Sequence, residues 1–198
     1  MSIQNEHKIL KYNVEYCRHT VIYSPSKHEK TSLVMQTIAE TKLLYASVDL
    51  SFAKDSTTIS LKLVNGVASA ASLILPNFRK DLNIVQKFFK AFKILVEING
   101  YKFSNTSANT IDIIYEAFNS LSKLATSQNK TIVFYIDEFQ NITYSENFRP
   151  ILGAIRNIAQ QTTHLSFIFS GSNQQLLSTL FNDSSMPLYL LCDRLGEI

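Results

Sequence analysis

A lysine and a threonine stand side by side at the start of a predicted helix, directly after a short apolar strand at residues 20–23. The segment that joins strand and helix reads SPSKHEKT and ends in Lys30 and Thr31. In a phosphate-binding loop, a lysine reaches the β- and γ-phosphates of a nucleotide and a threonine hydroxyl ligates magnesium. The pattern GxxxxGK followed by serine or threonine is half present, because Ser24 and Glu29 replace the two glycines. By itself, the pair also fits a solvated first turn of a helix.

Two acidic residues, Asp137 and Glu138, close a second apolar run at residues 131–136. In proteins that hydrolyse nucleoside triphosphates, one acid at a strand tip holds magnesium through water and a second acid polarises the attacking water. A solvated strand end, or a cap of the following turn, would also contain such residues. Together with the lysine–threonine pair, the two acids predict a nucleotide-binding architecture.

The remaining elements must bring these two segments together. Continuous apolar runs predict four buried parallel strands, at residues 20–23, 43–50, 131–136 and 165–169. Apolar residues at helical spacing predict helices between and after them, at residues 33–38, 85–96, 111–124, 151–158 and 176–180. Strands that alternate with helices indicate an α/β sheet in which ligands bind beyond the carboxyl ends of the strands. We therefore expect Lys30 and Asp137 to meet at that edge.

Length and composition narrow the class of protein. The 198 residues, of which 45% are apolar, suffice for a single domain over residues 1–198, which excludes a disordered chain. A net charge of +3 provides no field that would attract nucleic acid. Cys17 and Cys192 have neither metal-ligand nor disulfide-framework spacing, so we expect a reducing, cytoplasmic location. The uninterrupted apolar runs are shorter than the roughly 20 residues of a membrane-spanning helix, so we expect no membrane partner.

Three further stretches carry a resemblance to a known family. The stretches YIDEFQNI, FIFSGSNQQLLSTLFND and MPLY, together with the segment ending in Lys30 and Thr31, resemble the archaeal-ATPase family within the STAND and AAA+ P-loop NTPases. The resemblance implies a three-layer α/β P-loop NTPase core with a mostly parallel sheet flanked by helices. It also implies ATP and magnesium as ligands.

The same resemblance assigns roles to individual residues. Lys30 would bind phosphate, while Thr31 and Asp137 would bind magnesium. The catalytic candidates are a water-activating acid, Glu138, and a polar sensor of the γ-phosphate, Ser170 or Ser172. The other candidate nucleotide-binding residues belong to the loop and to the helix start: Ser24, Ser26, Lys27, His28, Glu29 and Ser32.

Glu29 is the largest departure from the family pattern, because it stands where a glycine precedes the lysine. A side chain at positive φ costs about 1–2 kcal/mol. A carboxylate about 4 Å from a phosphate oxygen adds roughly 4 kcal/mol of repulsion at an effective dielectric constant of about 20. Since micromolar affinity corresponds to about 8 kcal/mol, a loss of about 5 kcal/mol moves binding into the millimolar range.

Two functions follow from these matches and departures. The first is an ATP-binding P-loop ATPase domain that is weak or slow because its phosphate loop, a Walker A motif, is degenerate. The second is a nucleotide-free pseudo-ATPase that serves as a protein-interaction module, and a protein partner is expected in either case. DNA handling rests on fold analogy alone. Because the chain stops at Ile198, we expect the core without the family's C-terminal lid and winged helix.

Two arginines, Arg149 and Arg156, follow the acidic tip. In an oligomer, such a residue could stabilise transition-state charge in a neighbouring subunit. The alternative is a solvated helix face, which the sequence favours.

Overall fold

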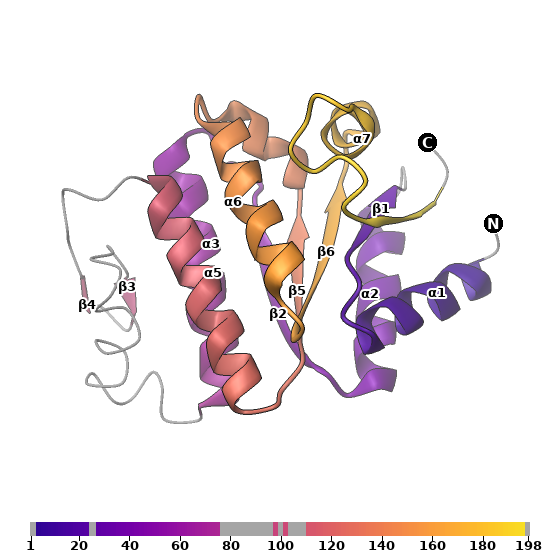
Figure 1. Cartoon of the computed structure of the whole chain (residues 1–198). Helices are drawn as coiled ribbons and strands as arrows, with labels where there is room; N and C mark the ends of the chain where they lie inside the picture. Colours follow the sequence, from indigo (N-terminus) through magenta and orange to yellow (C-terminus); the bar gives the residue numbers. More distant parts are fainter. Residues whose placement is uncertain (1–2, 24–26, 76–96, 99–100, 103–109, 197–198) are drawn as a thin grey trace.

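A five-stranded parallel sheet in the order β2-β5-β6-β1-β7 forms the centre of the protein (Figure 1). The computed structural model describes residues 3–23, 27–75, 97–98, 101–102 and 110–196. The strands of the sheet are β1 (Thr20–Tyr23), β2 (Leu44–Asp49), β5 (Ile132–Asp137), β6 (Leu165–Gly171) and β7 (Asp193–Leu195). All neighbouring strands of this sheet are parallel, which confirms the predicted α/β class and the four predicted strands.

Three strands were not expected from the sequence, and one expected helix is not described. The edge strand β7 consists of Asp, Arg and Leu, so it lacks the apolar run that indicated the other strands. The strands β3 (Glu97–Ile98) and β4 (Tyr101–Lys102) pair in an antiparallel manner in a second, two-stranded sheet. The helix predicted at residues 85–96 lies outside the described residues.

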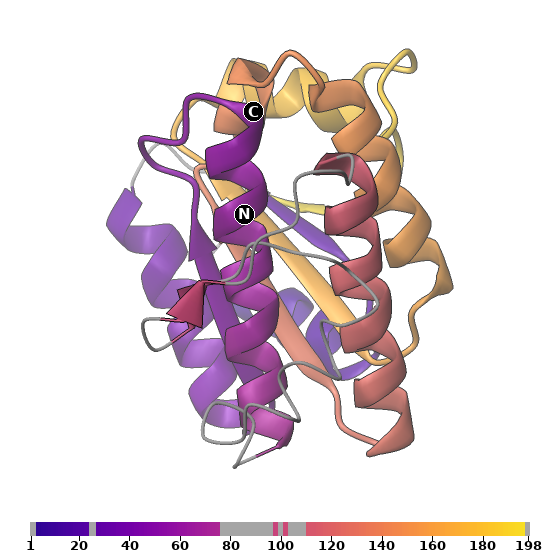
Figure 2. The same ribbon diagram turned by 90° about the vertical axis from the view of Figure 1, so that its left-hand side faces the viewer.

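Helices cover both faces of the central sheet and complete three layers. The helices α1 (Ile3–Glu15) and α2 (Lys27–Thr41) pack on one face, and α3 (Ser56–Ile74), α5 (Thr110–Ser127) and α6 (Phe148–Gln161) pack on the other (Figure 1). Figure 2 shows the same layers from the side. The 3-10 helix η1 (Phe139–Tyr144) and the helix α7 (Gln174–Asn182) follow β5 and β6 at the carboxyl edge of the sheet, which is uppermost in Figure 1.

The alternation of side chains along the strands decides which polar groups face α2. On β5, Tyr135 packs in the core cluster on the α2 side, whereas Phe134 packs in the cluster on the α3, α5 and α6 side. Because successive side chains of a strand point to opposite faces, Asp137 lies on the same face as Tyr135. On β6, the same rule separates Ser170 from Phe169, which packs on the α3, α5 and α6 side. The strands therefore direct Asp137 and Ser170 toward α2.

The helix α3 is long and apolar enough, by length and composition, to span a membrane. Its apolar run is interrupted in the sequence by Lys62 and Asn65, which explains why run length alone did not indicate it. Nine of its residues are buried, and it packs against β2 and α5. In this structure α3 is a core helix of the domain.

Candidate functional site

Lys30 lies in the first turns of α2, and its side chain is 1% exposed. Its Nζ atom donates a hydrogen bond of 2.8 Å to the carbonyl oxygen of Gly171, the last residue of β6. The register of the sheet places Gly171 beside Tyr23, the residue that ends β1. The lysine therefore reaches from the helix that follows β1 to the tip of the neighbouring strand β6.

The helix α2 begins at Lys27, so Lys27 to Glu29 are helical. His28, which was expected in a loop, lies in the first turn of this helix, and only residues 24–26 connect β1 with α2. A helix leaves its first N–H groups without intrahelical acceptors, so an anion at this end could still meet backbone donors. The described part of the chain does not include Ser24, Ser26 or the side chains of Lys27, His28 and Glu29.

Asp137 ends β5 at a network of hydroxyl groups. Its Oδ1 atom accepts hydrogen bonds from Ser170 Oγ at 2.6 Å and from the N–H group of Glu138 at 2.9 Å. The Oγ atom of Ser170 lies 2.7 Å from Tyr135 Oη. Burial raises the pKa of Tyr135 well above its ordinary value, so the phenol stays protonated. The network therefore connects the ends of β5 and β6.

Thr31 and Asp137 offer the kind of atoms that a magnesium ion requires. Mg²⁺ takes oxygen ligands and is usually held by one or two protein groups together with water and substrate phosphates. Thr31 follows Lys30 on α2, and Asp137 binds Ser170, the residue before the Gly171 that binds Lys30, so both lie at one edge of the sheet. The described residues contain no group of three or more His, Cys, Asp or Glu side chains that could hold a metal. A threonine and one carboxylate fit magnesium bound together with a phosphate ligand.

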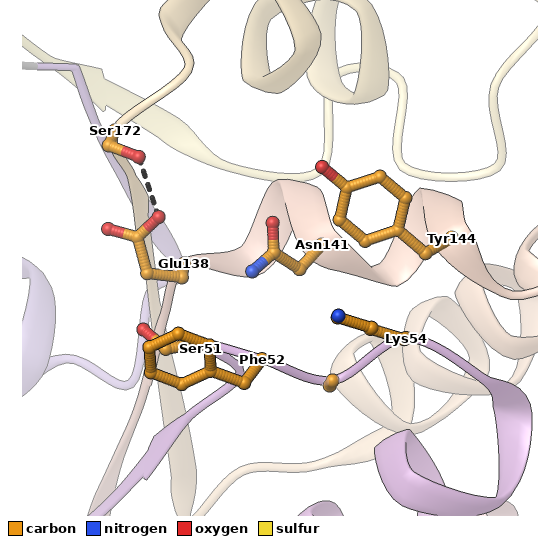
Figure 3. Close-up of a pocket in the computed structure, with 8 residues that line it drawn as sticks. Ser51, Phe52, Lys54, Glu138, Asn141, Tyr144 and Ser172 are labelled. Carbon is orange, nitrogen blue, oxygen red and sulfur yellow. Dashed lines mark hydrogen bonds between the residues drawn. The ribbon is translucent and has the colours of Figure 1, made fainter.

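Glu138 has a left-handed backbone conformation, with φ 53° and ψ 39°. For a residue with a side chain this conformation costs about 1–2 kcal/mol, and such strain is often found at functional sites. The Oε2 atom of the buried Glu138 accepts a hydrogen bond from Ser172 Oγ at 2.6 Å (Figure 3). It also accepts one from Gln140 Nε2 at 2.7 Å. Two donors on one carboxylate oxygen fix the position of this acid beside the end of β6.

Gln140 and Gly171 shape the site together. The Gln140 side chain is 5% exposed, and its Oε1 atom is buried against Gly171. A Cβ atom on Gly171 would overlap Gln140 Oε1, so the absence of a side chain at this position lets Gln140 reach Glu138. Gly171 also supplies the carbonyl group that binds Lys30. Gly171 therefore contributes to the positions of both Lys30 and Glu138.

An open pocket of about 390 Å³ borders Glu138 and lies beside η1 and the loop that follows β2 (Figure 3). It is lined by Ser51, Phe52, Ala53, Lys54, Glu138, Asn141, Tyr144 and Ser172. The side chains of Phe52 and Tyr144 are 89% and 61% exposed, so two aromatic rings border the pocket with much of their surface in solvent. The Asn141 amide donates to the carbonyl group of Leu50 and thereby ties η1 to this loop.

The two arginines differ in exposure: Arg149 is exposed on α6, as expected for a solvated helix face, whereas Arg156 is only partly exposed. Arg149 Nη1 donates to the carbonyl oxygen of Ser185 at 3.1 Å. Arg156 Nη1 donates to the carbonyl oxygens of Pro187 and Tyr189 at 2.6 and 2.9 Å. Both residues therefore hold the segment that contains MPLY against α6 of the same chain. The expectation of a solvated helix face is wrong for Arg156, because two backbone groups bind its guanidinium.

The structure brings the main residues named from the sequence to one edge of the sheet. Lys30 and Asp137 were expected to meet there, and they do so through the adjacent residues Ser170 and Gly171. Thr31 follows Lys30 on α2, and Ser172 donates a hydrogen bond to Glu138 at the same edge. Ser32 is exposed on α2. Sequence analysis missed three residues of the site: Tyr135, Gln140 and Gly171. The register of β5 could have indicated Tyr135, since it lies two residues before Asp137 on the same face.

No protein-family model and no curated protein matches the chain. Among solved structures, the chain is similar to a Walker-type ATPase of Pyrococcus abyssi, with a TM-score of 0.61 and 18% identity, covering 98% of this chain and 52% of that one. It is also similar to the ORC1 protein of Aeropyrum pernix in complex with DNA, with a TM-score of 0.53 and 11% identity, covering 98% of this chain and 45% of that one. The chain spans about half the length of these two structures. The likeness shows the fold alone, an α/β domain with a parallel sheet between two layers of helices.

Proposed function

We propose that this chain is a P-loop ATPase domain that binds ATP together with magnesium, with low affinity and slow hydrolysis. The observation that carries the proposal is the position of Lys30, whose Nζ atom binds the carbonyl group of Gly171 one residue after Ser170, the donor to Asp137. A buried ammonium group, a hydroxyl and a carboxylate thus converge at the carboxyl edge of a parallel sheet. Sheets of this kind bind their ligands at this edge.

Each residue at this edge would have its own role in phosphate binding or hydrolysis. Lys30 would exchange its contact with Gly171 for the phosphates, and Thr31 with Asp137 would hold the magnesium ion, which neutralises charge on the phosphate oxygens. Glu138 would accept a proton from the attacking water. Its carboxylate is already oriented by Ser172, so the acid needs little rearrangement before it acts.

Two features support weak binding. Glu29 and Ser24 occupy positions where the phosphate-loop pattern has glycines, and a carboxylate near the phosphates disfavours binding. The helix α2 already extends back to Lys27, which leaves three residues between β1 and α2 for a loop that wraps phosphates. We therefore expect a dissociation constant for Mg-ATP in the millimolar range.

The position of Lys30 also favours a second candidate function, a pseudo-ATPase that serves as a protein-interaction module without nucleotide. The lysine is 1% exposed and bound to the protein's own backbone, as a lysine with a purely structural role would be. In both cases we propose a cytoplasmic protein with a protein partner. Cys17 and Cys192 lie far apart in the sequence without the spacing of a disulfide framework, which favours a reducing compartment.

Calorimetric titration with Mg-ATP separates the two functions. The titration compares the wild type with Lys30→Ala, Glu29→Gly and the control Lys123→Ala, which removes an exposed lysine on the opposite helix layer. The ATPase proposal expects weak binding by the wild type and by Lys123→Ala, no binding by Lys30→Ala, and at least tenfold tighter binding by Glu29→Gly.

The other outcomes of the titration are equally clear. Binding by Glu29→Gly alone supports the interaction module, because the fold then retains a site that its own loop blocks. If none of the four proteins binds Mg-ATP, the nucleotide proposal is abandoned.

A further inference from the structure

Phe52, on the loop that follows β2, combines an exposed ring with a left-handed backbone. Its side chain is 89% exposed, and its φ angle is 62°. Both features cost free energy, because a side chain at positive φ strains the backbone and a ring in water gains nothing from burial. Glycine or asparagine would fit this conformation at a lower cost. Folding therefore does not account for Phe52, and strain of this kind is often found at functional sites.

The loop that presents this ring is held from two other elements. On α3, the Nζ atom of Lys62 donates hydrogen bonds to the carbonyl oxygens of Asp49 at 2.7 Å and Ser51 at 2.9 Å. On η1, the amide of Asn141 donates a hydrogen bond of 3.1 Å to the carbonyl oxygen of Leu50. These bonds fix the backbone just before the exposed ring. A ligand would therefore not have to order the loop, which lowers the entropic cost of binding.

The ring of Phe52 borders the open pocket of about 390 Å³ beside η1, together with an acid and a second ring. Figure 3 shows Glu138 and Ser172 at one end of this pocket and Tyr144 at the other. Ser172 Oγ donates a hydrogen bond of 2.6 Å to the Glu138 carboxylate, so the negative charge has a fixed position. The faces of aromatic rings carry partial negative charge. A carboxylate and two rings around one space therefore attract a cation.

The same residues disfavour other classes of ligand. An anion would meet the fixed carboxylate of Glu138, and an apolar group would remove water from Ser51 and Asn141 without replacing its hydrogen bonds. The ammonium group of Lys54 lies between the two rings in Figure 3, so the pocket already accommodates a cation of the protein itself. Because Lys54 is exposed and has a long side chain, it can move aside for a ligand.

We propose that this pocket binds an arginine side chain of a partner protein, with the guanidinium group paired with Glu138 and stacked on Phe52 and Tyr144. Arginine fits better than lysine, because its planar guanidinium group stacks on aromatic rings and its N–H donors match a carboxylate. The volume is near the lower end of the range for ligand pockets, roughly 300–1,000 Å³, which suits one side chain. Binding would also slow hydrolysis, since a carboxylate paired with a cation is a weaker proton acceptor, and this consequence rests on the proposed function.

The test uses N-acetyl-arginine amide as the probe and N-acetyl-citrulline amide, which has a similar shape without the charge, as its control. Chemical shifts of the backbone amides of the protein report the binding of both compounds in the absence of nucleotide. We expect the wild type to bind the arginine probe at least about tenfold more tightly than the citrulline probe. Glu138→Gln, which keeps the size of the side chain, should remove this preference.

Three further variants examine the walls of the pocket. Phe52→Leu and Tyr144→Leu should each weaken binding of the arginine probe about two- to fivefold, because they remove a ring face and keep an apolar side chain. Lys54→Ala removes a like charge and should strengthen binding about two- to fivefold. The control is Tyr12→Leu, which removes a tyrosine that is 51% exposed on α1 and should leave the affinity unchanged. Circular dichroism establishes that each variant is folded.

The outcomes separate this inference from the proposed function. Equal binding of the two probes by the wild type overturns the inference, as does a preference for arginine that persists in Glu138→Gln, and neither result affects nucleotide binding. In a wild type that hydrolyses ATP, a saturating arginine probe should lower the rate about threefold or more, and an unchanged rate overturns the effect on hydrolysis. A wild type that binds no Mg-ATP but prefers the arginine probe overturns the proposed function and supports the arginine pocket.

Discussion

The Nζ atom of Lys30 and the carbonyl oxygen of Gly171 are joined by a hydrogen bond of 2.8 Å, and Gly171 lies beside Tyr23, the last residue of β1. A lysine side chain that is 1% exposed is costly unless its ammonium group is paired with polar atoms. The contact meets part of this need and ties α2 to the tip of β6. Phosphate binding by Lys30 would require this bond to be exchanged, so the same residue affects both stability and ligand binding.

Replacing Lys30 should separate these two effects. Lys30→Ala leaves the Gly171 carbonyl without its donor and opens a cavity, so we expect the free energy of unfolding to fall by about 1–3 kcal/mol. Lys30→Met keeps most of the packing of the side-chain stem and should lose less. Urea denaturation followed by circular dichroism measures both variants. Mg-ATP should raise the melting temperature of the wild type and leave that of Lys30→Met unchanged. An Ala variant as stable as the wild type would show that the buried contact is absent in solution.

Because the backbone of Glu138 is left-handed, we expect glycine at this position to be more stable than alanine, which is the reverse of the usual order within a helix. Both Glu138→Gly and Glu138→Ala lose the bonds from Ser172 and Gln140, but only glycine adopts positive φ without penalty. We therefore expect Glu138→Gly to be more stable than Glu138→Ala by about 1 kcal/mol in chemical denaturation. At Lys123, an exposed position within α5, the order should be the usual one, with alanine more stable by about 1 kcal/mol. The same order at both positions would mean that Glu138 is not strained.

Gly171 should be sensitive to the addition of a single methyl group. The new Cβ atom in Gly171→Ala would overlap Gln140 Oε1, the end of a side chain that can rotate away. We expect Gln140 to leave Glu138, with a loss of at least tenfold in the rate of ATP hydrolysis and a change in stability below about 2 kcal/mol.

The control for Gly171 is another glycine of the same chain. A Cβ atom on Gly153, within α6, would meet no atom within 4 Å, so Gly153→Ala should stabilise the protein by about 0.5–1 kcal/mol. If Gly171→Ala hydrolyses ATP as fast as Gly153→Ala, then Gln140 does not orient Glu138. If the wild type has no measurable hydrolysis, the test uses the free energy of unfolding instead. The loss of this free energy caused by Gly171→Ala should then be smaller in a Gln140→Ala background than in the wild type.

The meeting of Lys30 and Asp137 could be predicted from the sequence because each follows an apolar run. Continuous apolar runs indicate strands buried on both faces, and parallel strands present their carboxyl ends at one edge. No side-chain contact had to be known for this inference. The strand β7 could not be predicted in the same way, since Asp193 and Arg194 carry charges and the strand lies at the edge of the sheet.

The fine structure of the site depends on register, which apolar patterns do not contain. Tyr135 was read as one of several strand-forming residues. The register places Tyr135 beside Ile168 of β6, and its hydroxyl group lies 2.7 Å from that of Ser170, two residues further along β6. The start of α2 at Lys27 was also missed, because a polar first turn and a phosphate-binding loop use similar residues. The contacts of Arg156 depend on the path of the chain after α7, which has no periodic pattern.

Stability should depend on pH through His19, the residue before β1. Its Nδ1 atom accepts a hydrogen bond from the N–H group of Phe167 at 3.2 Å, so the proton of the neutral ring is on Nε2, which lies 2.8 Å from the carbonyl oxygen of Ala159. Burial lowers the pKa of His19 below its ordinary value, because the charged ring is poorly solvated. The folded protein therefore binds fewer protons than the unfolded chain below about pH 6.5, the ordinary pKa of histidine.

The sign of this effect follows directly. The contribution of His19 is fully present above about pH 6.5 and is lost as the pH falls toward the lowered pKa of the folded state. Protonation of Nδ1 would also break the bond from Phe167. Urea unfolding between about pH 5 and 7.5 should show stability that falls toward acid in the wild type and falls less steeply in His19→Gln. His19→Gln should be less stable than the wild type at neutral pH, since glutamine does not reproduce both contacts of the ring. Equal slopes for the two proteins would assign the acid sensitivity to other groups.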